Sequence, residues 1–294
     1  MTSPPTRVRH RLSSARRRYL AVVYTGVTLV SIAILAPVAW MVMASVTPQR
    51  ILISRPLQWI PDELDWSRYA EIFRGGSRSA GATFRAAMGN SLVVATATVA
   101  AAIVVGVLGA YAFARLRFRF RGAVLMLLLA TYMLPQIALL IPLYLILSAA
   151  GLLDNRLGLV IVDLSLVVPF VLWILANYFT TIPEELEDAA RVDGATRLGA
   201  LWHVVLPSAR PGLFAAIMFA FLLAWDEFMY ALIFTSTDAS KTLPVAISEF
   251  SGRYTTDFGL VAAGGFLAAL PALVIAVAGQ RYVVSGMGTG AVKG

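Results

Sequence analysis

Six long stretches without any Asp, Glu, Lys or Arg limit what this chain can fold into more than any other feature. They lie at residues 19–49, 86–114, 122–153, 164–183, 211–225 and 258–280. A helix needs about 20 apolar residues to cross the hydrocarbon layer of a membrane. The 294 residues are 59% hydrophobic and 14% charged, whereas a soluble domain is about 25% charged. The chain is therefore predicted to be an all-α membrane protein.

These stretches predict six transmembrane helices, because the short run at 211–225 resumes after Asp226 and Glu227. The predicted spans lie near 20–46, 87–114, 122–147, 157–179, 209–234 and 258–280. The first span is longer than the apolar region of a cleaved signal peptide, so it is interpreted as a retained anchor. Proline removes a backbone hydrogen bond and bends a helix, so bends are predicted at Pro135, Pro142, Pro169 and Pro271.

The basic residues, apart from Arg210 at the start of the fifth span, lie outside these spans and indicate the orientation. Arginine is concentrated in the tail 1–18 and in the connection 115–121, and positive charge gathers on the cytoplasmic side of a membrane. Both termini and the loop 180–208 are therefore predicted to be cytoplasmic, in the inner (plasma) membrane. The long loop 47–85, with a short amphipathic helix around Trp66–Phe73, is predicted outside. The net charge of +8 is explained by topology and attraction to anionic lipid, without nucleic acid.

The predicted organisation has three parts. Residues 1–18 form a cytoplasmic basic tail, residues 19–284 form the six-helix membrane domain with its loop 180–208, and residues 285–294 form a flexible cytoplasmic tail. Cysteine is absent and histidine occurs twice, so no metal cluster is expected. A phosphate-binding loop needs Gly-Lys followed by Ser or Thr, but Ser240 precedes Lys241 and Val292 precedes Lys293. The chain is predicted to be no enzyme and to hold no cofactor.

The polar segment 180–208 is predicted to form a helix-turn-helix. Thr181 to Glu185 favour a helix start, with a capping hydroxyl and acids near the positive end of the helix dipole. The predicted apolar anchors are Leu186, Val192, Leu198 and Leu201. A helix lying on the membrane surface is the alternative. The acids Glu184, Glu185, Glu187, Asp188 and Asp193 disfavour it, because anionic lipid headgroups would repel them.

Within this segment, Asp188-Ala189-Ala190, then Gly194, then Val204-x-Leu206-Pro207 closely resemble the "EAA" loop of ABC-importer permeases. Asp188 stands where that family usually has Glu. The resemblance implies a short coupling helix that docks into a groove on an ATP-binding subunit. The residues it assigns to this coupling are Glu187, Asp188, Ala189, Ala190, Asp193, Gly194, Ala195, Leu206 and Pro207.

The ending Gly288–Gly294 also resembles the "GAVKG" ending of maltose-type sugar permeases. Together these resemblances imply the type I ABC-importer permease fold and one subunit of a carbohydrate importer. Four implied partners complete it: a sister permease forming a heterodimer, a dimeric ATP-binding subunit that holds ATP and Mg, an extracytoplasmic solute-binding lipoprotein, and membrane lipid.

Polar side chains inside the spans are the candidates for a substrate pathway, because polar groups in lipid are costly. They are Asn90, Gln136, Asp163, Asp226 and Glu227. Asp226 replaces Asn of a Trp-Asn-Glu-Phe pattern in the same family. The competing interpretation is structural: these groups pair with one another, with Arg156 or Arg253, or with helix backbone. A proton-coupled secondary transporter that uses the intramembrane acids remains the alternative function.

Overall fold

The structure is a computed structural model that describes residues 14–56, 58–76, 79–250 and 257–288. In these ranges every regular element is a helix. The four long helices are α1 (Ser14–Val46), α4 (Ala80–Arg115), α7 (Arg156–Phe179) and α14 (Phe258–Gly288). The shorter elements are α2 (Gln49–Leu52), α3 (Ser67–Arg74), α5 (Arg121–Ala130), η1 (Thr131–Met133), α6 (Gln136–Ala149), α8 (Glu184–Val192), α9 (Arg197–Ala200), η2 (Leu201–Val205), α10 (Leu206–Ser208), α11 (Arg210–Trp225), α12 (Met229–Phe234) and α13 (Leu243–Ser248).

Four helices are long and apolar enough to cross a membrane, and the number rises to six if each of two bent pairs counts as one span. The all-α membrane fold is confirmed. The amphipathic helix predicted around Trp66–Phe73 is also confirmed as α3. Residues 285–288, assigned to the flexible tail, belong to α14. Residues 1–13 and 289–294, which carry most of the basic tail and of the Gly288–Gly294 resemblance, lie outside the described residues.

The third predicted span is not one straight helix. It divides into α5–η1 and α6, which meet at 97°. Leu134 is extended at φ −73° and ψ 125°, because the residue before a proline is pushed out of the helical region. Pro135 therefore ends one helix and precedes the next, whereas Pro142, Pro169 and Pro271 lie inside continuous helices.

The fifth predicted span is also interrupted. At its start the loop residues 197–208 meet α11 at 82°, and inside it Asp226–Phe228 separate α11 from α12. Before the first break the chain forms the π-helical turn η2, at Leu201–Val205. Pro207 has no amide proton for the carbonyl of His203, and a wider turn accommodates that loss.

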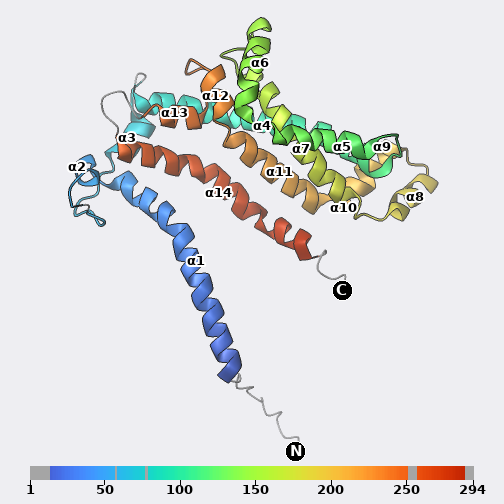
Figure 1. The fold of residues 1–294 in the computed structure, drawn as a ribbon, viewed down its shortest axis with the longest axis horizontal. Coiled ribbons are helices and arrows are strands. Elements are labelled where there is room, and N and C mark those ends of the chain that lie inside the picture. Colours follow the sequence, from blue (N-terminus) through green and yellow to red (C-terminus); the bar gives the residue numbers. More distant parts are fainter. Residues whose placement is uncertain (1–13, 57, 77–78, 251–256, 289–294) are drawn as a thin grey trace, which may run out of the picture.

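The core lies where α4 packs along α7, with α11 and α14 beside them (Figure 1). Gly106 and Gly109 permit the close approach of α4 to α7. A Cβ atom at Gly106 would lie 2.5 Å from Cγ1 of Val171, and one at Gly109 would lie 2.8 Å from Cδ1 of Leu172. Small residues at such contacts let helix backbones pack closely in membranes.

We expect Gly106→Leu to lower the free energy of unfolding by about 1–3 kcal/mol, since overpacking forces side chains and backbone to shift. Gly89→Leu is the matched control in the same helix, because nothing lies within 4 Å of a Cβ atom there. Denaturation in mixed micelles measures the difference. Equal stability of the two variants would contradict the packing role of Gly106.

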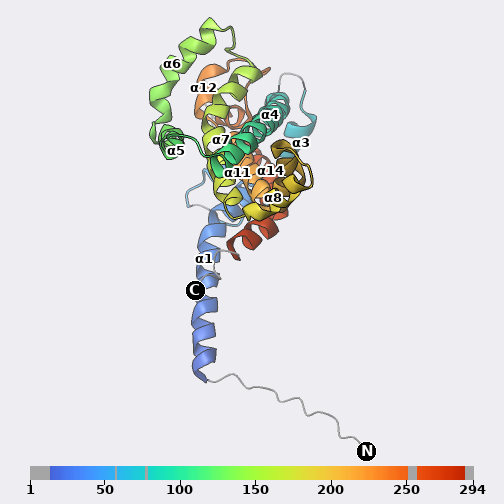
Figure 2. The ribbon, with the colours of Figure 1, turned by 90° about the vertical axis from the view of Figure 1, so that its right-hand side faces the viewer.

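Helix α1 is the least embedded element. It contacts α14 and extends away from the rest of the molecule in both views (Figures 1 and 2). Side chains such as Val22 and Ile34 are 72% and 66% exposed. Near its end, the buried Arg68 of α3 donates to the backbone carbonyl of Thr47 at 2.6 Å and pairs with Asp257 at 3.1 Å. The exposed apolar length of α1 must face lipid or a neighbouring subunit.

Candidate functional site

The loop 180–208 folds as the predicted helix-turn-helix. Acids occupy the first turn of α8, where they favour the helix dipole. Gly194 has a φ of +92° and follows α8 in a Schellman turn, in which the amide of Ala195 donates to the carbonyl of Ala190 at 2.9 Å. The Thr196 hydroxyl then accepts from the amide of Gly199 at 3.1 Å and caps α9.

The predicted cap at Thr181 is wrong. Its hydroxyl donates to the carbonyl of Tyr178 at 2.7 Å, and no side chain caps the start of α8. Thr181 lies two residues after the end of α7, whose last carbonyls lack helical partners and attract nearby donors. Pro183 stands before α8 instead.

One face of α8 and α9 is exposed. The side chains of Asp188 and Arg191 form an exposed ion pair at 3.3 Å, and Ala189, Asp193, Gly194 and Pro207 are exposed as well, with Ala190 and Ala195 half-buried. Among the predicted anchors, Leu186, Val192 and Leu198 are 47%, 87% and 59% exposed. Trp202, which was not predicted, is 62% exposed. We call Leu186, Val192, Leu198 and Trp202 the apolar coupling patch. Leu201 is a correction: it is fully buried and anchors the loop to its own chain.

Glu187 and Leu206, in contrast, are buried. The Glu187 carboxylate is buried against α4, where it pairs with the guanidinium of Arg115 and accepts from the hydroxyl of Tyr111 at 2.9 Å. Arg115 also donates to the carbonyl of Ile182 at 2.8 Å. The side chains of Arg115 and Glu187 are 8% and 7% exposed. We call Tyr111, Arg115 and Glu187 the α4–α8 clasp.

Sequence reasoning missed Trp202, Tyr111 and Arg115. A tryptophan in an Ala- and Gly-rich polar loop was the available signal for Trp202. Tyr111 and Arg115 carry no such signal, because they lie more than 70 residues before Glu187 in the chain. Only the folding of α8 back against the end of α4 brings them together.

A cavity of about 510 Å³ opens where the two interrupted spans meet. Gln136 at the start of α6 and Asp226 after α11 line it with exposed side chains. Glu227 also lines it but is buried, and its carboxylate accepts from the amides of Tyr230 and Ala231 at 2.8 and 3.0 Å. Aromatic side chains complete the wall, among them Tyr132, Phe170 and Phe219. Three of the five predicted pathway residues therefore converge.

Asn90 and Asp163 lie elsewhere. The Asn90 amide donates to the carbonyls of Asp238 and Lys241, each at 2.9 Å. Asp163 is 2% exposed on α7, and its Oδ1 has no hydrogen-bond partner in the described structure. The proposed pairings of these groups with Arg156 are not found among the described ion pairs, and Arg253 lies outside the described residues.

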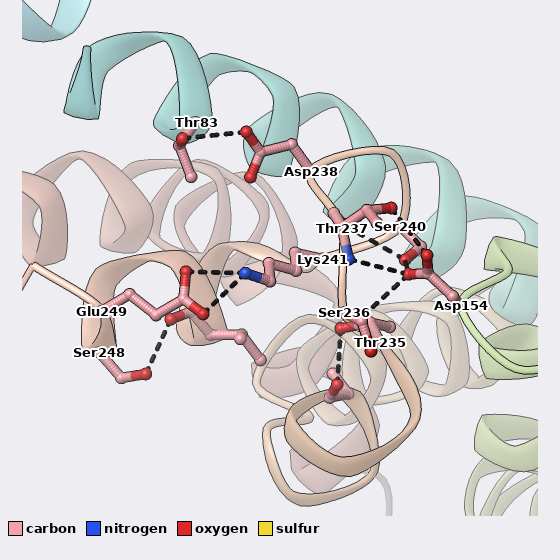
Figure 3. Close-up of polar contacts among 12 residues, drawn as sticks. Thr83, Asp154, Thr235, Ser236, Thr237, Asp238, Ser240, Lys241, Ser248 and Glu249 are labelled. Atoms are coloured by element: carbon pink, nitrogen blue, oxygen red, sulfur yellow. Dashed lines mark hydrogen bonds and ion pairs between the residues drawn. The ribbon is translucent and has the colours of Figure 1, made fainter. Parts of the chain in front are cut away.

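A network holds the loop 235–242 against the starts of α4 and α7 (Figure 3). The Asp154 carboxylate accepts from the amides of Ser236 and Thr237 at 2.9 and 3.0 Å and from the hydroxyls of Thr237 and Ser240. Burial alone would raise the pKa of Asp154, but these hydrogen bonds outweigh burial and hold that pKa well below its usual range. Asp154 is thus the anchor of this loop.

We expect Asp154→Ala to lower the free energy of unfolding by about 1–3 kcal/mol, since four donors lose a charged acceptor. Because the folded pKa is depressed, the contribution is present above the unfolded pKa of about 3.9 and fades as pH falls below it. Stability measured against pH for both proteins checks this. A difference that grows as pH falls would contradict it. Asp238→Ala is the control, since Asp238 makes one exposed side-chain contact, to Thr83 at 3.2 Å.

Comparison with known proteins decides the family. Residues 80–288 match the family described as "Binding-protein-dependent transport system inner membrane component". This chain belongs to that family. The match includes the coupling patch, the α4–α8 clasp and the cavity, so all three are parts of an integral membrane transport permease.

Individual relatives agree. The chain is 36% identical over 285 residues to the trehalose transport system permease protein SugB of Mycobacterium tuberculosis, covering 96% of this chain and 100% of that protein. It is 35% identical over 260 residues to the sulfoquinovosyl glycerol transport system permease protein SmoH of Agrobacterium fabrum, covering 88% and 89%. The fold is shared with a chain of a bacterial ABC transporter that imports alginate, with a TM-score of 0.74 and 22% identity over 92% of this chain and 99% of that one.

Proposed function

We propose that this permease subunit imports a carbohydrate or carbohydrate derivative and receives its driving force through the loop 180–208. The proposal rests on the observation that the loop has an exposed apolar patch and a separate buried attachment to α4. The apolar coupling patch is exposed, with Val192 at 87%, while Glu187 ties the same helix to α4. One face is thereby available to a partner, and the other is fixed to a membrane helix.

The partner of the patch is a dimeric ATP-binding subunit that holds ATP and Mg. This chain has no phosphate-binding loop, and among the described residues no group of three or more His, Cys, Asp or Glu is arranged to hold a metal ion. Movement of the ATP-binding subunits would shift α8, and the α4–α8 clasp would pass that shift to the spans. Glu187 and Leu206 then act by positioning the loop, while Asp188, Ala189, Ala190, Asp193, Gly194, Ala195 and Pro207 stand on or beside the docking face.

The remaining partners follow from the family and the relatives. The description of the family names a binding protein, so an extracytoplasmic solute-binding lipoprotein delivers the solute. A sister permease forms the other half of the pathway as a heterodimer and covers apolar surface such as that of α1. The carbohydrate class rests on relatives named for trehalose and sulfoquinovosyl glycerol transport. Neither relative supports the proton-coupled alternative.

Gln136 and Asp226 are the proposed solute contacts in this chain. Both side chains are exposed in the cavity and can bond sugar hydroxyls, beside aromatic rings whose faces suit the C–H side of a sugar. Glu227 is proposed to shape the cavity by capping α12. Asn90 and Asp163 are proposed to be structural, since Asn90 holds a loop and Asp163 does not line the cavity.

Single-cysteine labelling tests the orientation and the docking face together. The chain has no cysteine of its own, so Val192→Cys and Trp59→Cys each create one exposed thiol. We expect a membrane-impermeant maleimide added to intact cells to label Trp59→Cys and not Val192→Cys. In the purified complex, Val192→Cys should cross-link to the ATP-binding subunit.

The labelling has clear contrary outcomes. Reaction of Val192→Cys in intact cells would place the loop outside and refute the orientation. Cross-linking of both variants, or of neither, to the ATP-binding subunit would refute the docking face. Uptake of a labelled disaccharide that continues without any ATP-binding subunit would refute the proposed importer itself.

A further inference from the structure

The connection between α4 and α5 alternates arginine with phenylalanine. From Arg115 to Arg121 the sequence reads Arg-Leu-Arg-Phe-Arg-Phe-Arg. Arg115 is committed to the α4–α8 clasp, whereas Arg117, Arg119 and Arg121 are exposed. Within the described part of the chain no ion pair neutralises these three guanidinium groups. We call residues 117–121 the basic aromatic segment.

This segment is held close to the membrane surface. Only residues 116–120 connect α4 to α5, and both helices belong to candidate spans. At about 3.5 Å per residue, so short a connection cannot carry its arginines far from the headgroup layer. The ring of Phe118 packs edge-on against Phe113, with centroids 5.3 Å apart, which fixes the segment to the end of α4.

Phe120 has an unusual conformation for its size. Its φ is +63°, which is disfavoured for a bulky side chain, and its side chain is 65% exposed. Its contact within the segment is the guanidinium of Arg119, 5.0 Å from the ring centroid. The chain thus holds an aromatic ring and a cation together at the surface, where neither group is stabilised by burial in the core.

We propose that the basic aromatic segment binds the headgroups of anionic phospholipids. A guanidinium donates paired hydrogen bonds to a phosphate diester, and an exposed phenylalanine ring beside basic residues can insert at the boundary between headgroups and acyl chains. Clustered basic residues beside a membrane helix attract anionic lipid in proportion to their number. Three unpaired arginines with an exposed ring among them fit that ligand. The leaflet follows from the proposed orientation, whereas the binding itself does not depend on it.

The test uses the complete transporter in nanodiscs of phosphatidylcholine with added phosphatidylglycerol. Phosphatidylglycerol that stays with the protein after detergent washing is quantified by mass spectrometry. The triple variant Arg117→Gln, Arg119→Gln, Arg121→Gln should retain less, by on the order of tenfold or more. The control is Arg55→Gln, Arg74→Gln, Arg156→Gln, which removes the same charge from exposed arginines before α4 and at the start of α7. It should retain phosphatidylglycerol as the wild type does.

Three results would overturn the proposal. One is an equal loss of lipid in both triple variants, which indicates non-specific charge attraction. Another is unchanged lipid retention with failed assembly of the ATP-binding subunit, which makes the segment a protein contact. The third is unchanged lipid retention in Phe120→Gly, which would contradict the role of the ring. We expect this variant to retain less lipid, yet to have a higher thermal midpoint in detergent, since glycine accepts a positive φ. Failure of the proposed importer function would not alter any of these lipid measurements.

Discussion

Replacing Arg115 by methionine is expected to lower the free energy of unfolding by about 3–5 kcal/mol, because Glu187 is left buried without its charge partner. Both side chains are more than nine-tenths buried, so solvent cannot compensate. Denaturation in mixed micelles measures this change. Solute uptake by the reconstituted importer should fall further than stability alone explains, since α8 loses its tie to α4.

The double variant Arg115→Met, Glu187→Leu separates these two effects. Removing both charges should recover much of the stability, because apolar pairs often replace buried ion pairs without loss. Uptake per ATP hydrolysed should stay low, since the link to the span is still absent. The control is Glu63→Gln, which removes an exposed ion pair with Arg50 that lies outside the loop 180–208 and is worth at most about 1 kcal/mol. Full recovery of uptake in the double variant would show that the clasp serves stability alone.

Gly194→Asp is expected to uncouple ATP hydrolysis from solute uptake. The φ of +92° at Gly194 disfavours other residues by about 1–2 kcal/mol, and the new carboxylate adds charge to the proposed docking face. Nothing lies within 4 Å of a Cβ atom there, so the variant should fold. The measurement is the ratio of solute transported to ATP hydrolysed in proteoliposomes.

Gly194→Asn is the matched control, because asparagine is close to aspartate in size and also adopts the left-handed region, but it adds no charge. It should lose less coupling than Gly194→Asp. If Gly194→Asp transports as well as the wild type, the turn after α8 does not meet the ATP-binding subunit. If the two variants lose coupling equally, backbone conformation alone explains the effect.

The sequence predicted six spans with bends at four prolines, and the structure interrupts two of these spans, the third at Pro135 and the fifth at Asp226–Phe228. Hydropathy reports whether a residue tolerates lipid, but it does not report helix direction. Pro135 was visible in the sequence, and its effect on Leu134 follows from local sterics. Pro142, Pro169 and Pro271 were predicted to act in the same way, but they lie inside continuous helices. Neighbouring helices can satisfy the carbonyl that a proline leaves free. Which proline ends a helix depends on those neighbours.

The polar residues of the spans show the same limit. Their cost in lipid predicted that Asn90, Gln136, Asp163, Asp226 and Glu227 would each have a partner or a purpose. The structure divides them: Gln136 and Asp226 line the cavity, Glu227 bonds the amides of α12, and Asn90 bonds loop carbonyls. Composition cannot distinguish a cavity wall from a helix cap, because both use the same side chains.

The amino-acid sequence alone determined that this chain lies in a membrane and that it keeps one polar helix-turn-helix loop. These properties depend on neighbouring residues, so they can be read locally. Only the tertiary structure decided that Glu187 faces α4, that Leu201 is buried while Val192 is not, and that Asp154 anchors a distant loop. Those outcomes depend on contacts between residues far apart in the chain, and such contacts exist only after the helices have packed.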